Sequence, residues 1–214
     1  MAKFIPVDVF DLVIFGGAGD LALRKLMPAL YHRDGDGQLP SGCRILSIGR
    51  SAMSRKAFLG AVEQSLRANL AGTEFAEDAW RGFSARLHYI QADAVDPAGW
   101  QELEAALRGF EERIRVVYLA TAPALFGPVA LGLRQNGLIH EHTRIVLEKP
   151  VGRDYASARQ INDRVGLLSA PSIPTEGAAW RQPAQRIPLA VGEMPPQGIA
   201  GASLAQLRAT AYML

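Results

Sequence analysis

A run of glycines that joins a short apolar stretch to a helical pattern constrains this chain most. Leu12 to Phe15 form a strand-like run, and the residues that follow fit the pattern Gly17-x-Gly19-x-x-Ala22. In dinucleotide-binding fingerprints of this form, one glycine permits a tight turn, another lets the backbone approach a pyrophosphate, and the small third residue allows close packing of helix and strand. The helix N-terminus then offers unpaired N–H groups to the phosphates. A ligand-free turn is the alternative, but the flanking strand and helix favour dinucleotide binding.

The bulk properties of the chain are those of a globular protein. Of its 214 residues, 49% are hydrophobic and 21% are charged, the mean hydropathy is +0.05 and the formal net charge is +2. No cluster of Lys and Arg predicts nucleic-acid binding, and no apolar run is long enough to predict a membrane span. Cys43 is the single cysteine, which excludes an intrachain disulfide and favours a reducing compartment. We expect a soluble, cytoplasmic protein that binds neither nucleic acid nor membrane.

Apolar runs alternate along the chain with segments of helical periodicity. The sequence predicts strands at 9–15, 44–49, 86–92, 114–120 and 144–148. It predicts helices at 20–33, 54–70, 97–111, 124–136 and 153–165. The third of these helices would have Asp96 as its cap and Pro97 as its first residue. Short buried strands that alternate with helices predict an α/β fold, a doubly wound parallel sheet of Rossmann-like type with helices on both faces.

The composition of the chain changes near Val165. Residues 166–214 contain no Lys and no Asp, and they hold six of the 13 prolines. Prolines at this density break most helices and central strands. We therefore expect a dinucleotide-binding domain over 1–165 and an irregular, Pro/Ala-rich tail over 166–214, with at most one short helix in its last part.

Residues suited to a dinucleotide follow three further predicted strands. The second strand runs into Arg50 and Ser51, where a site for NAD usually has an acidic residue that accepts from the ribose 2′-hydroxyl. Arg50 instead offers a guanidinium fork suited to a 2′-phosphate, with a solvated loop arginine as the alternative. The fourth strand runs into Tyr118-Leu-Ala-Thr-Ala-Pro123, whose small residues leave room for a ligand. Asp93 ends the third strand, as a ligand contact or equally as a helix cap or turn carboxylate.

The remaining candidates are a lysine and a pair of histidines. The fifth strand ends in Leu147-Glu-Lys-Pro150, which puts Lys149 where a nicotinamide and a substrate would meet. A lysine binds a hydroxyl or a phosphate as a compact cation. His140-Glu-His142 could suggest a metal pair, but no third ligand follows nearby, so we expect no metal. The acidic loop after the first helix has Leu39 where a calcium loop needs glycine, which excludes that interpretation.

Four segments together resemble one enzyme family. They are Phe15-Gly-Gly-Ala-Gly-Asp-Leu-Ala-Leu-Arg-Lys25, Gly49-Arg50-Ser51, Tyr118-Leu-Ala-Thr-Ala-Pro123 and Glu148-Lys-Pro-Val-Gly152. In order and spacing, over about residues 8–165, they are similar to the N-terminal NADP-binding domain of glucose-6-phosphate dehydrogenase. The first and last segments are specific as a pair, although either alone is weak. Position 23 is often lysine in the family and is Leu23 here.

The resemblance implies NADP as the cofactor, glucose 6-phosphate as the substrate, and hydride transfer from sugar C1 to NADP in the pentose phosphate pathway. The residues implied to contact the cofactor are Gly16, Gly17, Ala18, Gly19, Asp20, Leu21, Arg50, Ser51, Asp93, Ala94, Ala120, Pro123 and Lys149. Among these, the glycine turn would bind the pyrophosphate and Arg50 the 2′-phosphate. Lys25 and Lys149 are the implied substrate contacts, the first near the active site and the second between cofactor and sugar.

The chain departs from the family in its last part. The family continues with Arg-Ile-Asp-His-Tyr-Leu-Gly-Lys, which holds the substrate phosphate, and then with a domain that carries the catalytic histidine and the subunit interface. None of the four histidines here lies in such a run, so no catalytic residue is assigned. We expect negligible dehydrogenase activity and no family oligomer interface, with truncation or a change of reading frame as the origin of the tail. A nucleotide-binding module without catalysis and another Rossmann sugar oxidoreductase are the alternatives.

Overall fold

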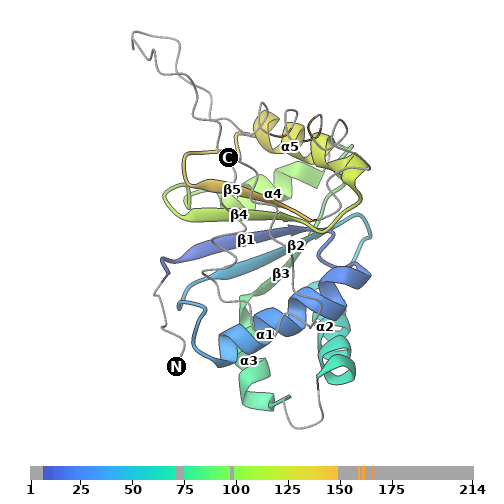
Figure 1. The fold of residues 1–214 in the computed structure, drawn as a ribbon, viewed down its shortest axis with the longest axis vertical. Helices are drawn as coiled ribbons and strands as arrows, with labels where there is room; N and C mark the ends of the chain where they lie inside the picture. The colour runs from blue at the N-terminus through green and yellow to red at the C-terminus, as the bar shows by residue number, and fades with distance from the viewer. Residues whose placement is uncertain are drawn as a thin grey trace.

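In the part of the chain that the structure describes, all five strands are parallel. The computed structural model describes residues 7–70, 75–96 and 99–148, together with Arg159, Ile161 and Val165. Within them, one sheet has the strand order β3-β2-β1-β4-β5 (Figure 1). The strands are β1 (Phe10–Phe15), β2 (Arg44–Gly49), β3 (Leu87–Gln91), β4 (Ile114–Leu119) and β5 (Thr143–Leu147). The predicted parallel sheet is therefore confirmed.

Helices cover both faces of the sheet, as the sequence predicted. Helices α1, α2 and α3 lie on one face, and α4 and α5 lie on the other (Figure 1). Their bounds, with those of a π turn η1 and a 3₁₀ turn η3, are η1 (Ala22–Leu26), α1 (Met27–Gly35), α2 (Arg55–Asn69), α3 (Glu77–Arg86), α4 (Trp100–Leu107), η3 (Pro123–Leu125) and α5 (Phe126–Gln135). Successive side chains of β1 point to opposite faces of the sheet. Val13 packs with Trp100 of α4, and Ile14 packs with Phe58 of α2.

Helix α3 was not predicted from the sequence. It buries only Phe83 completely, so its ten residues carry little of the periodicity that indicates a helix. Glu77 and Asp78 stabilise its first turn through the helix dipole. Helix α4 is shorter than the predicted 97–111, because the backbone becomes extended at Arg108 and Gly109 follows with φ +79°.

Three predicted features lie largely or wholly outside the described residues. Pro97, predicted to begin the helix that became α4, is one of them. The predicted helix 153–165 is another, apart from its three described residues, each of which is helical. The expected irregular tail over 166–214 also lies outside the described part of the chain.

The first helix begins with a π turn that the sequence did not predict. Its hydrogen bond runs from Met27 N to the carbonyl of Ala22, one residue further back than in an α-helix. Pro28 has no N–H to donate to the next carbonyl, that of Leu23. The hydroxyl of Ser65 on α2 donates to it instead, at 2.7 Å. The π turn carries Lys25, which the family resemblance implies as a substrate contact.

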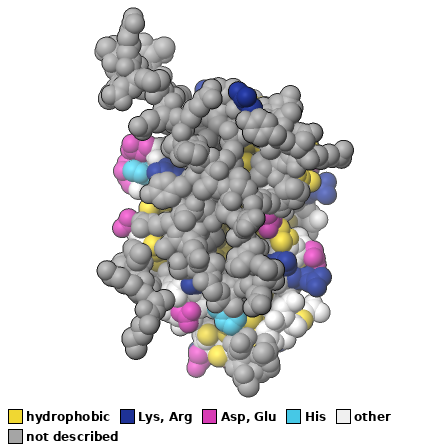
Figure 2. Space-filling model, in the orientation of Figure 1, with side chains coloured by type: hydrophobic (Ala, Val, Ile, Leu, Met, Phe, Trp, Pro, Cys, Tyr) yellow, Lys and Arg dark blue, Asp and Glu magenta, His cyan; other side chains and the backbone are white. Residues whose placement is uncertain are grey.

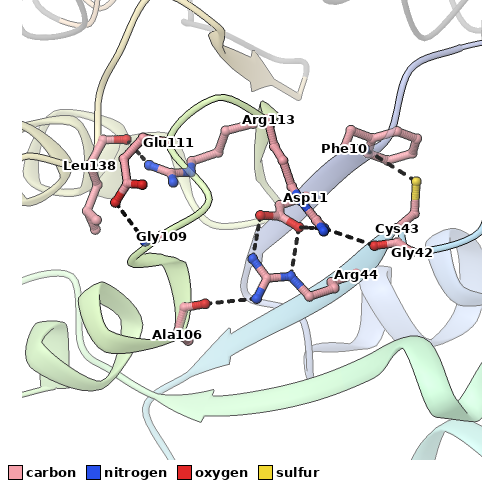
Figure 3. Close-up of polar contacts among 11 residues, drawn as sticks. Phe10, Asp11, Gly42, Cys43, Arg44, Ala106, Gly109, Glu111, Arg113 and Leu138 are labelled. Atoms are coloured by element: carbon pink, nitrogen blue, oxygen red, sulfur yellow. Dashed lines mark hydrogen bonds and ion pairs between the residues drawn. The ribbon is translucent and has the colours of Figure 1, made fainter.

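Ion pairs hold the amino-terminal edge of the sheet together. Asp11 of β1 is fully buried and lies opposite Arg44 of β2 and Arg115 of β4. Arg44 donates to both carboxylate oxygens of Asp11, through Nε at 2.8 Å and through its second terminal nitrogen (Figure 3). Its guanidinium also lies 3.8 Å from the ring centroid of Phe110. A buried charge is tolerated only when it is paired. The charged side chains at the amino-terminal edge therefore serve to stabilise the fold.

The visible surface carries both signs of charge. In Figure 2, the described acidic, basic and hydrophobic side chains are interspersed over this face rather than gathered by kind. Among the described residues, no helix is long and apolar enough to cross a membrane.

Candidate dinucleotide-binding site

The candidate residues converge at the carboxyl-terminal edge of the sheet. The glycine turn follows β1, and the segments that begin at Arg50, Asp93 and Ala120 come after β2, β3 and β4. In the sheet order, β1 lies between β2 and β4, so the direction in which the chain adds strands reverses there. Ligands of open α/β sheets bind in the crevice at this reversal, outside the carboxyl ends of the strands.

Two glycines of the turn are required by close packing. Gly16 has φ +82°, and a Cβ placed on it would lie 2.5 Å from the carbonyl oxygen of Ala120. A Cβ on Gly17 would lie 2.5 Å from Cβ of Ser47. The amides of both glycines donate to the carbonyl of Ile48, at 2.9 and 3.1 Å. These contacts fix the turn between β2 and β4.

The third glycine faces open space at the start of the helix. Gly19 is exposed, and a Cβ on it would meet only the carbonyl oxygen of Gly16, at 3.1 Å. The carbonyl of Gly19 accepts from Leu23 N at 2.9 Å, which begins the helical hydrogen bonds. The amides of Asp20 and Leu21 come before that bond and have no partner within the helix. An exposed glycine beside such amides fits a pyrophosphate.

Arg50 and Ser51 form the turn after β2, and both are exposed. Side chains of β3 hold the backbone of this turn, since Gln91 Nε2 donates to the carbonyl of Arg50 at 3.2 Å and the Tyr89 hydroxyl donates to that of Ser51 at 2.7 Å. The guanidinium of Arg50 therefore extends from an anchored backbone on the β2 side of the glycine turn.

The structure gives Asp93 a role in its own turn. One carboxylate oxygen of Asp93 accepts from Val95 N at 3.1 Å, and its carbonyl accepts from Trp100 Nε1 at 3.0 Å. These contacts favour the turn carboxylate over the ligand contact that the sequence left equally open. Ala94 packs in part against the core on the α4 face.

A cluster of polar side chains, Glu148, Tyr118 and Lys25, lies on the β4–β5 side of the glycine turn. Glu148 directly follows β5, and its carboxylate is hydrogen-bonded to the hydroxyl of Tyr118. Burial raises the pKa of Glu148, against the lowering effects of Tyr118 and of the positive charge of Lys25. Burial is the largest cause that raises the pKa of Tyr118, and the charge of Glu148 is the second. The Tyr118 hydroxyl therefore stays protonated at neutral pH. Lys25 therefore lies close enough to the end of β5 for its charge to act on Glu148, whereas Lys149 lies outside the described residues.

The segment after β4 lies beside the end of β1. Ala120 donates its amide to the carbonyl of Phe15 at 2.9 Å, which ties the segment to the end of β1. The hydroxyl of Thr121 is buried without a partner among the described residues, beside Gly16. Pro123 begins the turn η3 and lines a pocket together with Gly127 and Pro128 of α5.

Five polar residues near the site were given no role from the sequence, although three of them lie in the segments that carry the family resemblance; the five are Tyr89, Gln91, Tyr118, Thr121 and Glu148. Alternation along β3 and proximity to the glutamate–lysine–proline run were the signals available for them. Among the described residues, no group of three or more His, Cys, Asp or Glu side chains could hold a metal ion.

These features define a class of protein. A parallel sheet with a glycine turn at a helix N-terminus, at the point where strand order reverses, is a Rossmann-type dinucleotide-binding domain. The family model described as glucose-6-phosphate dehydrogenase, NAD binding domain, matches residues 13–171. This chain belongs to that family.

Individual relatives carry the same name. The glucose-6-phosphate 1-dehydrogenases of Rhizobium meliloti and Mycolicibacterium smegmatis are 42% and 43% identical over 167 and 169 residues, which are 78% and 77% of this chain and 34% of each relative. The crystal structure of the Mycobacterium avium enzyme has a TM-score of 0.69 at 28% identity, over 76% of this chain and 34% of that one. A glucose-6-phosphate dehydrogenase in complex with glucose 6-phosphate has a TM-score of 0.64 at 26% identity, over 78% and 36%. The chain therefore spans about a third of the length of these relatives.

Proposed function

We propose that this chain is the coenzyme-binding part of a glucose-6-phosphate dehydrogenase and that its carboxyl edge binds NADP. The observation that carries the proposal is the exposed glycine turn at the helix N-terminus, with Arg50 on the anchored turn beside it. A pyrophosphate fits at Gly19, where a Cβ would meet only one backbone oxygen. The guanidinium of Arg50 binds the 2′-phosphate, since the end of β2 has no acidic residue to hold a free 2′-hydroxyl.

The proposed reaction is oxidation of glucose 6-phosphate at C1, in which NADP supplies the hydride acceptor. The polar group on the β4–β5 side serves the sugar. Lys25 provides a positive charge there, and the Tyr118 hydroxyl holds the Glu148 carboxylate in place. Lys149 follows Glu148 directly and is proposed to contact both cofactor and sugar.

A general base is not supplied by the described site. All four histidines are described, and none lies at the carboxyl edge, because His32 is in the last turn of α1, His88 is near the start of β3, and His140 and His142 precede β5. Loss of a general base costs about 10²- to 10⁴-fold in rate. We propose that the 214-residue chain binds cofactor with negligible turnover.

The location and the domain boundary belong to the same proposal. The single cysteine, Cys43, is buried and free, which suits a reducing compartment and a cytoplasmic protein. The dinucleotide-binding domain is proposed to end near residue 165, with a separate tail after it, although the family match continues to residue 171.

Replacement of Arg50 tests the proposed function. The Arg50→Ala variant should bind NADPH about 10- to 150-fold more weakly, because a hydrogen bond to a charged group contributes about 1.5–3 kcal/mol. Binding of NADH, which has no 2′-phosphate, should hardly change. Titration of coenzyme fluorescence with the 214-residue chain gives both constants.

Arg108→Ala is the matched control, since Arg108 is an exposed arginine that precedes β4 at the other edge and pairs with Glu104. It should bind both coenzymes normally. Equal losses of NADPH and NADH in Arg50→Ala would show that Arg50 supports the fold rather than binding the phosphate.

A further inference from the structure

The turn after β2 is held by side chains where backbone pairing of the sheet ends. Its two carbonyls, those of Arg50 and Ser51, accept from Gln91 and Tyr89 of β3. These two donors are two residues apart, so they lie on the same face of the strand. Two successive peptide groups of an exposed turn are thus fixed before any ligand arrives.

Tyr89 is itself fixed on two sides. Its ring lies against Phe58 of α2, with centroids 5.3 Å apart, and Phe58 is fully buried. Its hydroxyl passes over Gly49, where a Cβ would lie 2.6 Å from the phenol oxygen. Gly49 and Tyr89 are therefore matched, because a larger residue at position 49 would displace the phenol.

We propose that Tyr89, aided by Gln91, is a positioning residue that sets the Arg50–Ser51 turn for the 2′-phosphate and so contributes to the choice of NADP over NAD. The inference rests on the proposed function. Tyr89 acts through the backbone of the turn and does not touch the coenzyme. A preorganised backbone leaves less conformational freedom to be lost when the Arg50 side chain binds a phosphate. NAD has no phosphate at this place, so its binding gains nothing from the preorganised turn.

The Tyr89→Phe variant tests this inference, because it removes one oxygen and keeps the ring on Phe58. With the 214-residue chain and coenzyme fluorescence, the Kd for NADPH should rise about 3- to 10-fold, the range expected for one lost hydrogen bond. The Kd for NADH should stay constant, so the ratio of the two constants should move by the same factor. A tyrosine needed only for the fold would not move this ratio.

Tyr31→Phe is the matched control. The Tyr31 hydroxyl also donates to a backbone carbonyl, that of Ala76, at 3.2 Å, and it accepts from the amide of Ala76 at 2.9 Å. That bond joins α1 to the start of α3 and does not involve the turn after β2. Its loss should lower the melting temperature and leave the ratio of NADPH to NADH binding unchanged.

The outcomes separate this inference from the proposed function. An unchanged ratio in a folded Tyr89→Phe variant, whether both constants rise or neither does, overturns the inference. If Arg50→Ala then still loses NADPH binding selectively, the proposed function stands. A ratio that moves in Tyr89→Phe but not in Arg50→Ala removes Arg50 as the phosphate ligand and overturns the inference, because Tyr89 is proposed to act through Arg50. If Tyr89→Phe does not fold, the exposed Gln91→Ala variant provides the same test, with the same direction expected.

Discussion

At the scale of residues, the glycines of the turn after β1 have different roles, some in folding and one in binding. Gly16 has a positive φ and touches the chain after β4, and Gly17 touches Ser47 of β2. Both are needed by the folded protein with or without a ligand. Gly19 has neither constraint, because its surroundings are open apart from one backbone oxygen. Gly19 is therefore the glycine of this turn at which we expect a role in ligand binding.

Replacement of Gly19 by valine should separate binding from folding. We expect Gly19→Val to fold and to lose NADPH and NADH binding together, since the branched side chain occupies the space above the helix N-terminus where both pyrophosphates bind. The matched variant is Gly16→Ala, which should lower the free energy of unfolding by about 1–3 kcal/mol because its conformation is strained.

Urea unfolding and coenzyme titration of both variants provide the measurement. A folded Gly19→Val protein that keeps its affinity for NADPH would argue against dinucleotide binding at this turn.

At the scale of elements, the two edges of the sheet are built for different purposes. The amino-terminal edge is filled by charged side chains of adjacent strands, with Asp11 paired to Arg44 and Arg113. At the carboxyl-terminal edge, turns present backbone groups and exposed side chains to the crevice. All four histidines lie away from the carboxyl-terminal edge, with His88 in β3, His140 and His142 before β5, and His32 in the last turn of α1.

The connection between α5 and β5 should make stability depend on pH. The ring of His140 accepts from the amide of His142 through Nδ1, at 3.2 Å, and its Nε2 is buried without a partner among the described residues. Two effects lower the pKa of His140 to about 4. The larger is burial, and the second is the nearby positive charge of Arg115. The folded state therefore binds fewer protons than the unfolded state between about pH 4 and the unperturbed value near 6.5.

Stability should consequently fall as pH falls through this window. The His140→Gln variant, which does not titrate, should lose less stability between pH 7 and pH 5 than the unaltered chain. The difference should be about 1 kcal/mol, because the ring is only partly buried and solvent weakens the effect. Urea unfolding of both proteins at the two pH values measures it, and identical pH dependence would contradict a neutral, buried His140.

At the scale of the whole molecule, the sequence predicted the sheet and the segments at its carboxyl edge. Each strand is a short apolar run that ends at small residues or a turn, which is a local signal. Helix α3 lacks such a signal, since only Phe83 is fully buried. The π turn depends on a hydroxyl of α2, that of Ser65, and the Arg50–Ser51 turn depends on Tyr89 of β3. Contacts between segments distant in sequence cannot be predicted from local periodicity.

Hydrogen–deuterium exchange with and without NADP tests most directly whether the carboxyl edge of this chain binds NADP. We expect slower exchange in peptides covering residues 16–25 and 49–53, with weaker protection of the second peptide by NAD. Peptides covering 138–143, at the opposite edge, should exchange equally with and without coenzyme. Unchanged exchange at both turns of a folded chain at saturating NADP, or protection confined to the opposite edge, would contradict NADP binding at the carboxyl-terminal edge.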